Sequence, residues 1–239
     1  MAVRTEARPI PRITTKAEKA WWRRPWIGPL ALVVLAFLSF SLPPYLALDP
    51  AQSRVPAPEG FPAHYWFLVG HVIFGSIAMI GAVLQIWPWL RRTHPVVHRY
   101  AGRAYVFAGV LPSGLMALTI GSQSPFGPVT RVSDVLAAVL WIGCTIAGWR
   151  AVRERRFGDH PKWMIRSVTL TFSIIVNRVI SPIAMIVLEP QIPTTFGGSE
   201  LAYGQSVGAL SSWGGLFFAL VVSQLILERR PAKKPVGVR

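Results

Sequence analysis

The chain has 239 residues and a mean hydropathy of +0.42, and 52% of its residues are hydrophobic while only 15% are charged. This composition indicates a membrane protein, in which apolar side chains face lipid as well as one another. The formal net charge of +15 does not indicate a nucleic-acid partner, because no soluble basic domain accompanies the apolar segments.

A basic leader, residues 1–25, comes first, and we expect it to be disordered in the cytoplasm. Six apolar stretches follow that qualify as helices across ~30 Å of hydrocarbon with their backbone groups bonded internally, although the third is short and contains Pro112. We therefore predict an all-α fold, a polytopic membrane helical bundle over residues 26–228, followed by a basic cytoplasmic tail, 229–239. The six predicted transmembrane helices are residues 26–48, 65–90, 104–120, 132–149, 163–188 and 205–227.

The basic residues gather in alternate connections. Of the 25 Lys and Arg residues, 22 lie in the leader, in residues 91–103 and 150–166, or after residue 227. The other connections carry acidic residues instead. This pattern follows the positive-inside rule and predicts that both termini are cytoplasmic. The same basic groups should contact anionic lipid headgroups.

Motifs for established chemistry are missing from the sequence. There is no phosphate loop, nucleophile elbow or zinc-protease signature. The single cysteine, Cys144, falls within a predicted helix, so we expect neither a disulfide framework nor a cysteine metal site. The catalytic residues are therefore unknown, and whether the protein is an enzyme stays open.

Two cytoplasmic connections resemble each other. THPVVHRYAGRAY precedes the third span and DHPKWMIRS precedes the fifth, and each contains a His-Pro pair, an aromatic residue and an arginine. The similarity suggests a parallel repeat in which the second and third helices correspond to the fourth and fifth.

Four features together resemble the bacterial multi-pass membrane proteins grouped as domain of unknown function 2306. They are the helix of His71, the segment HRYAGRAY, the segment HPKWMIRS and the later Arg178. The resemblance covers residues 65–188 and implies a multi-pass protein of the bacterial cytoplasmic (plasma) membrane, without an established reaction. Pro161-Lys162 stands where the family pattern has His-Arg, so a role for that arginine does not carry over.

The histidines suggest a haem site. A b-type haem needs two imidazoles at similar depth on facing helices, one on each side of the iron. His98 and His160 share the cytoplasmic end and would meet if the third and fifth predicted helices are neighbours. His71 has no second imidazole at its depth, because His64 lies ~10 Å away along the same helix. The cationic residues that could then hold the haem propionates are Arg99, Arg103 and Arg166. The alternative is that these histidines cap helices among lipid headgroups.

Arg178 marks a second candidate site. It lies within an apolar stretch, where a guanidinium costs from ~2.5 to more than ~10 kcal/mol unless it meets a polar partner. Asp134 is the nearest predicted counter-charge, and His71 and Asn177 add polar atoms. Such a cluster could bind an anion, a quinone headgroup or a proton. An Asp134–Arg178 ion pair that merely joins two helices is the alternative.

Three functions stay open on this basis. The first is a redox protein that binds haem b or a quinone, with His71, His98 or His160 in the site. The second is a small-solute or proton transporter built on Arg178, Asp134 and His71. The third is a non-catalytic membrane scaffold or assembly factor. Lipid is the one expected partner, and a homo-oligomer or another membrane protein stays open.

Overall fold

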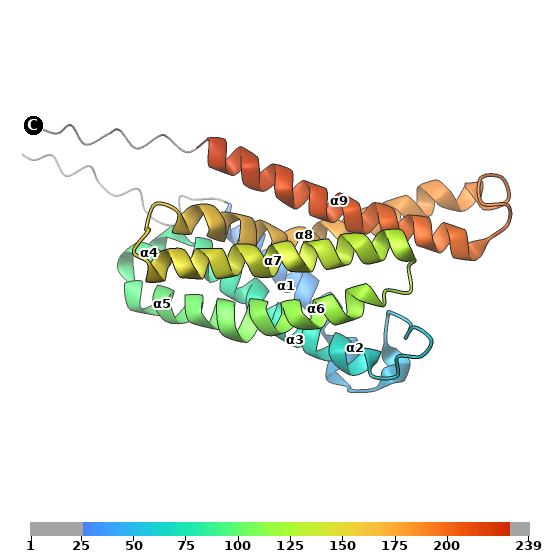
Figure 1. Ribbon diagram of the computed structural model, residues 1–239, viewed down its shortest axis with the longest axis horizontal. Coiled ribbons are helices and arrows are strands. Elements are labelled where there is room, and N and C mark those ends of the chain that lie inside the picture. The colour runs from blue at the N-terminus through green and yellow to red at the C-terminus, as the bar shows by residue number, and fades with distance from the viewer. Residues whose placement is uncertain (1–25, 230–239) are drawn as a thin grey trace, which may run out of the picture.

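The computed structural model describes residues 26–229, and its helices lie side by side in one elongated bundle (Figure 1). The predicted helical membrane bundle is confirmed, because five helices in this range are long and apolar enough to cross a bilayer. Their bounds are His64–Ile86, Pro95–Ser122, Pro128–Arg153, His160–Gln191 and Glu200–Glu228. The predicted leader and most of the predicted tail lie outside the described residues.

The first predicted span forms a shorter helix. The helix α1, Ile27–Ser41, has 15 residues and is followed by the single turn α2, Pro43–Leu46. Pro43 and Pro44 supply no backbone N–H, so the ladder of i to i−4 bonds cannot continue through them. α1 buries only Val34 and Leu38, which pack against α3 and α8. A short 3₁₀ turn, Pro50–Gln52, lies in the connection to α3.

The second span, α3, runs over His64–Ile86 and ends four residues before its predicted boundary. Pro88 follows, and a residue that precedes proline avoids the helical region. Trp87 accordingly has extended angles, φ −71° and ψ 109°. The chain then turns into α4, Pro88–Thr93, of which only residues 88–90 were expected to belong to the second span.

The third span is longer than predicted, because it begins at Pro95 rather than at residue 104. It consists of α5, Pro95–Arg103, a π-helix η3, Ala104–Val110, and α6, Leu111–Ser122. Pro112 cannot donate a helical hydrogen bond, yet the helix continues. The preceding residue, Leu111, bonds instead to the carbonyl of Val106, five residues back. This wider π register accommodates a proline that would otherwise break the span.

The last three elements complete the bundle. α7 covers Pro128–Arg153, α8 covers His160–Leu188 with the 3₁₀ turn Glu189–Gln191, and α9 covers Glu200–Glu228. α8 and α9 form a long antiparallel pair that extends beyond α7 (Figure 1). They can approach closely because a Cβ on Gly215 would lie only 2.9 Å from the carbonyl oxygen of Ser173.

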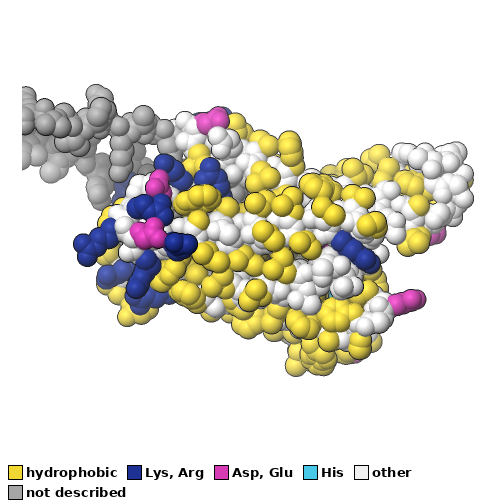
Figure 2. Space-filling view, viewed as in Figure 1, with side chains coloured by type: hydrophobic (Ala, Val, Ile, Leu, Met, Phe, Trp, Pro, Cys, Tyr) yellow, Lys and Arg dark blue, Asp and Glu magenta, His cyan; other side chains and the backbone are white. Residues whose placement is uncertain are grey.

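Apolar side chains cover the outside of the bundle. Leu32, Ile186 and Phe217 expose 68%, 72% and 69% of their surface, as expected of helices in contact with bilayer hydrocarbon. Figure 2 shows that Lys and Arg gather instead at one end of the molecule. We call this the basic end; it carries α4, α5 and the α7–α8 connection. The far end carries the α6–α7 and α8–α9 connections (Figure 1).

Candidate functional site

A cavity of about 730 Å³ lies at the basic end, within the size range of ligand sites. Its walls come from α1, α3, α4, α5, α8 and α9, and they are mostly apolar, as at Ile86, Met164, Phe172 and Phe218. The polar side chains among its walls are Gln85, Arg91, His98, His160 and Thr169. The two histidines that the sequence placed together therefore do line one cavity.

The orientation of His160 is fixed by α7. Its Nδ1 lies 2.9 Å from the carbonyl oxygen of Gly148. A carbonyl can only accept, so Nδ1 carries the proton and Nε2 of the neutral ring keeps its lone pair. Gly148 lets α7 and α8 pack closely at this point, because a Cβ on residue 148 would lie 2.6 Å from the Sδ of Met164 on α8. The imidazole is thus held in the tautomer that binds a metal through Nε2.

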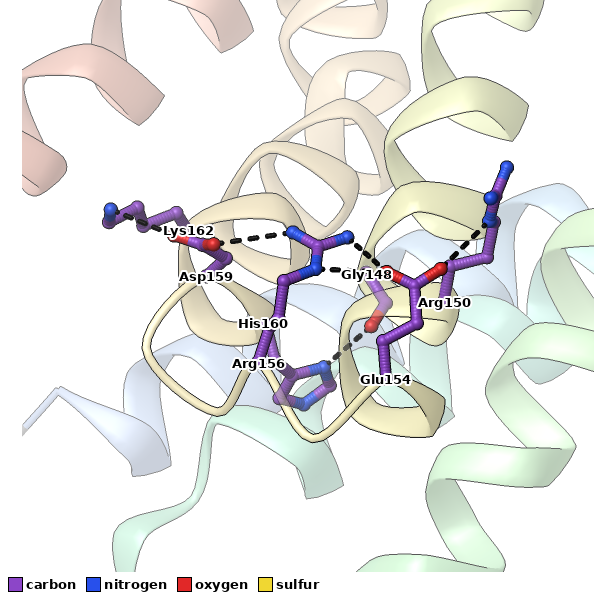
Figure 3. Close-up of polar contacts among 7 residues, drawn as sticks. All are labelled: Gly148, Arg150, Glu154, Arg156, Asp159, His160 and Lys162. Atoms are coloured by element: carbon purple, nitrogen blue, oxygen red, sulfur yellow. Dashed lines mark hydrogen bonds and ion pairs between the residues drawn. The ribbon is translucent and has the colours of Figure 1, made fainter.

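The connection that precedes His160 is held by ion pairs (Figure 3). Arg156 bridges Glu154 at 2.7 Å and Asp159 at 3.2 Å, and Lys162 bonds Asp159 at 3.0 Å. The hydrogen bonds from Arg156 lower the pKa of Glu154, and those from Lys162 lower the pKa of Asp159. All these groups are solvent-exposed, so each pair alone is weak. Together they fix the short turn that delivers α8, and with it His160, to the cavity.

His98 reaches the cavity from α5. Gln85 of α3 donates a 2.9 Å hydrogen bond to its backbone carbonyl, and Gly102 lets Gln85 come that close to α5. The imidazole itself is half-buried, and its Nδ1 has no hydrogen-bond partner in the described chain. His98 and His160 both line the cavity. The pair therefore presents two imidazoles from separate helices.

The three predicted propionate partners do not line the cavity. The guanidinium of Arg103 stacks 5.4 Å from the ring of Tyr100, and that of Arg166 lies 5.1 Å from the ring of Trp163. Arg99 is exposed on α5. The cation at the cavity wall is instead Arg91, which the sequence analysis did not assign. It lies in α4, at a position that the sequence analysis counted in the basic connection after the second span.

A buried hydroxyl cluster next to the π-helix was not foreseen. The hydroxyl of Tyr105 lies 2.6 Å from Ser167 and 2.9 Å from Thr171. Trp141 donates to Thr171 at 2.9 Å, and Thr145 lies 2.6 Å from Ser167. The sequence held one signal of this cluster, because Ser167 and Thr171 are four residues apart and share a helix face.

His71 lies toward the far end, where it bonds a neighbouring helix and does not face the cavity at the basic end. Its Nδ1 contacts the carbonyl of Ser113 at 3.0 Å, and the Ser113 hydroxyl donates to the carbonyl of His71 at 2.9 Å. The bond joins α3 to α6. His71 does not line the cavity at the basic end, so it is separate from the pair of His98 and His160.

Arg178 and Asp134 do not form the ion pair considered from the sequence. No ion pair or hydrogen bond joins Arg178 to another residue in the range 26–229. Asp134 instead accepts a hydrogen bond from Ser212 of α9. Asn177 faces α9 at Gly215.

Comparison with models of protein families identifies the family of the chain. The family described as predicted membrane protein (DUF2306) matches residues 68–203, from α3 to the start of α9. Neither the curated proteins nor the solved structures provide a match to the chain.

Proposed function

Since this chain belongs to the predicted membrane protein family DUF2306, whose description assigns no reaction, we propose that it is a membrane redox protein that binds haem b. The cavity at the basic end would be the binding site, and His98 and His160 would hold the iron. The single observation that carries the proposal is that two imidazoles from different helices line one cavity.

The side chains present fit such a group. His160 has the backbone acceptor on Nδ1 that ligating histidines normally have. The walls are apolar and aromatic, as the porphyrin ring requires, and Arg91 supplies a cation for an acidic substituent. When bound, haem would supply one-electron chemistry. The protein's share is to orient the two imidazoles and to keep water from the ring faces.

The orientation of the chain belongs to the same proposal. The described Lys and Arg residues gather at the basic end (Figure 2), and basic loops favour the cytoplasmic side. We place the cavity in the cytoplasmic half of the plasma membrane, with both termini inside. The site would then exchange electrons with partners on the cytoplasmic side.

Haem titration tests the proposal. Purified protein in detergent is titrated with ferric haem, and we expect a shifted Soret band that saturates at one haem per chain. His160→Ala and His98→Ala should each weaken binding at least ~10-fold, the loss expected when a metal site is deprived of a ligand or its support. His71→Ala is the matched control, because His71 has a similar Nδ1 bond but lies outside the cavity. Equal titrations for all four proteins would refute the assignment.

A quinone headgroup is the second candidate for the same cavity. The observation that favours it is the unpartnered Nδ1 of His98, because a proton on Nε2 would make this ring a donor to a quinone carbonyl. Chromatography of the lipids that copurify with the wild type and with His98→Ala distinguishes the two. A quinone retained only by the wild type, with no Soret change on titration, would favour this candidate over haem.

A further inference from the structure

The cavity at the basic end continues far beyond its two histidines. Its wall on α8 runs from His160 to Val176, which is ~24 Å at ~1.5 Å per residue. We call the part beyond the histidines the deep half. Its walls are Thr169, Phe172 and Val176 of α8 and Phe218, Ala219 and Val222 of α9. Among these six, Thr169 alone has a polar side-chain atom, and its hydroxyl already donates to the backbone carbonyl of Arg166 at 3.0 Å. The deep half is therefore apolar.

The cavity is open on the side between α1 and α9. Helix α9 packs on α7 and α8, while α1 packs on α3 and α8. Trp26, before α1, lines the cavity and still exposes 44% of its surface. Phe218 and Ile226 of α9 line it as well and expose 49% and 42%. Side chains that both line a cavity and reach the surface mark its opening. Since the outside of the bundle is apolar, this opening faces bilayer hydrocarbon.

The deep half is elongated along the helices. Phe218, Val222 and Ile226 follow one another at intervals of four residues on α9, so they share one face of that helix. Phe172 and Val176 share a face of α8 in the same way. The two helices thus present apolar stripes that run along the length of the bundle. A trough of this shape fits a hydrocarbon chain that lies along α8.

Two properties of the cavity indicate which molecule supplies the chain. A bilayer with its headgroup regions is ~40–45 Å thick, so one leaflet measures ~20–22 Å, close to the length of the wall on α8. The charge at the mouth is positive, because Arg91 lines the cavity while no Asp or Glu of residues 26–229 does so. Further Lys and Arg residues gather at this end (Figure 2). Such a mouth favours an anionic headgroup.

We propose that the deep half binds an acyl chain of an anionic phospholipid from the leaflet at the basic end. The lipid enters sideways between α1 and α9, its headgroup stays at the rim near Trp26 and Arg91, and its chain lies along Phe172 and Val176. The chain completes the wall that the helices leave open. The deep half begins at Thr169, ~14 Å along α8 from His160, so this inference does not depend on haem.

Photolabelling in nanodiscs tests this site. The full chain, without haem, is placed in phosphatidylcholine with a trace of phosphatidylglycerol that carries a photoactivatable diazirine in one acyl chain. Mass spectrometry then identifies the labelled residues. We expect label on Phe172 and Val176 that is displaced when unlabelled phosphatidylglycerol replaces part of the phosphatidylcholine. Phe217 is the internal control, because it faces outward beside Phe218 and is 69% exposed. Its label comes from bulk lipid and should not change.

Matched variants decide whether the chain lies inside the cavity. Val222→Trp fills the deep half and should lower the labelling of Val176 severalfold. Val221→Trp is the control, because Val221 is 40% exposed and does not line the cavity; it should leave the labelling of Val176 unchanged.

A second pair of variants tests the headgroup. The ratio of labelling by a phosphatidylglycerol probe to that by a phosphatidylcholine probe should fall ~5-fold in Arg91→Gln, the attraction of one basic side chain for anionic lipid. Arg92→Gln is the control, because Arg92 is exposed on the same helix but does not line the cavity.

The site would be overturned if phosphatidylglycerol displaced no more label from Val176 than from Phe217, or if both tryptophan variants had the same effect. Displacement by a long-chain quinone and not by phosphatidylglycerol would also overturn it. If Val222→Trp does not fold, the arginine pair decides, and equal labelling ratios in Arg91→Gln, Arg92→Gln and the wild type would exclude the anionic lipid. Because the labelling is read without haem, a failed haem titration leaves this result standing, and the reverse holds too.

Discussion

His160 and Gly148 are joined by a 2.9 Å hydrogen bond between an imidazole nitrogen and a backbone carbonyl oxygen. The bond spans the turn between α7 and α8, and it decides which nitrogen of the ring keeps a free lone pair. A histidine that capped the C-terminal part of α7 would make the same bond, so the role of Nε2 is decided by ligand binding. The bond therefore connects the local geometry of the turn to the proposed ligand role.

The turn itself should be sensitive to acid. The pKa of Glu154 and that of Asp159 are lowered by hydrogen bonds from Arg156 and Lys162. A lowered folded pKa means that the stabilisation is complete above the ordinary carboxyl pKa of ~4 and disappears as pH falls through the lowered values. We expect amide exchange in residues 154–160 to speed up below about pH 4, beyond its intrinsic pH dependence.

Hydrogen exchange measured by mass spectrometry checks this expectation. Residues 192–199, in the connection between α8 and α9, contain no carboxylate side chain and serve as the internal control. If both segments show the same pH dependence relative to their intrinsic rates, the ion pairs do not hold the turn.

Gly109 should be intolerant of a side chain. A Cβ there would lie 2.9 Å from the backbone N and Cα of Ala78, where α3 packs against the π-helix. Gly109→Ala should therefore destabilise the protein by about 1–3 kcal/mol, because helix backbones have to separate. Gly143→Ala is the control, because no atom lies within 4 Å of its Cβ position. Thermal unfolding in detergent should show a lower transition only for Gly109→Ala, and equal shifts would contradict the packing.

The hydroxyl of Tyr105 should contribute to stability. Its ring is fully buried, and Tyr105→Phe removes the contacts with Ser167 and Thr171 without changing the ring. We expect a loss of about 1 kcal/mol, because polar contacts between membrane helices average ~0.6 kcal/mol and reach ~1.7 kcal/mol. Tyr100→Phe is the control, since Tyr100 is 65% exposed. Unfolding in a series of denaturing detergent concentrations measures the free energy of unfolding of both variants. An unchanged free energy of unfolding in Tyr105→Phe would show that the cluster does not stabilise the protein.

The proposed orientation predicts which loops are accessible. With Cys144 replaced by serine, a single cysteine at Thr93 should be protected in intact cells from a membrane-impermeant maleimide. A cysteine at Ser53 should react, because the connection after α2 would face outward. Labelling after cell lysis shows that both positions can react. Reaction at Thr93 and protection at Ser53 would reverse the orientation.

Hydropathy predicted the long spans well because ~20 apolar residues in lipid have to be helical. It did not predict the start of the third span at Pro95, because HRYAGR is too polar to count as apolar although it lies within α5. The π register before Pro112 also has no hydropathy signal. It depends on a carbonyl of Val106 that accepts from Leu111, five residues on.

The candidate sites were only partly predictable. The shared end of His98 and His160 followed from the charge pattern, whereas the shared cavity depends on how α4 and α5 pack with α1, α3, α8 and α9. Arg91 was not assigned because it lies after the break at Pro88. Asp134 was expected to be the partner of Arg178 because the two side chains have opposite charges and lie at similar depths in the predicted spans. Ser212, from a helix 78 residues further along the chain, bonds Asp134 instead.

The central claim is that two imidazoles hold one haem at the basic end. Low-temperature electron paramagnetic resonance of the haem-loaded ferric protein tests it directly, because two strong nitrogen ligands give a low-spin iron. We predict a low-spin signal for the wild type and for His71→Ala, and a high-spin signal when either His98 or His160 is replaced by alanine. A low-spin signal that survives both replacements, or a high-spin signal in the wild type, would contradict this account.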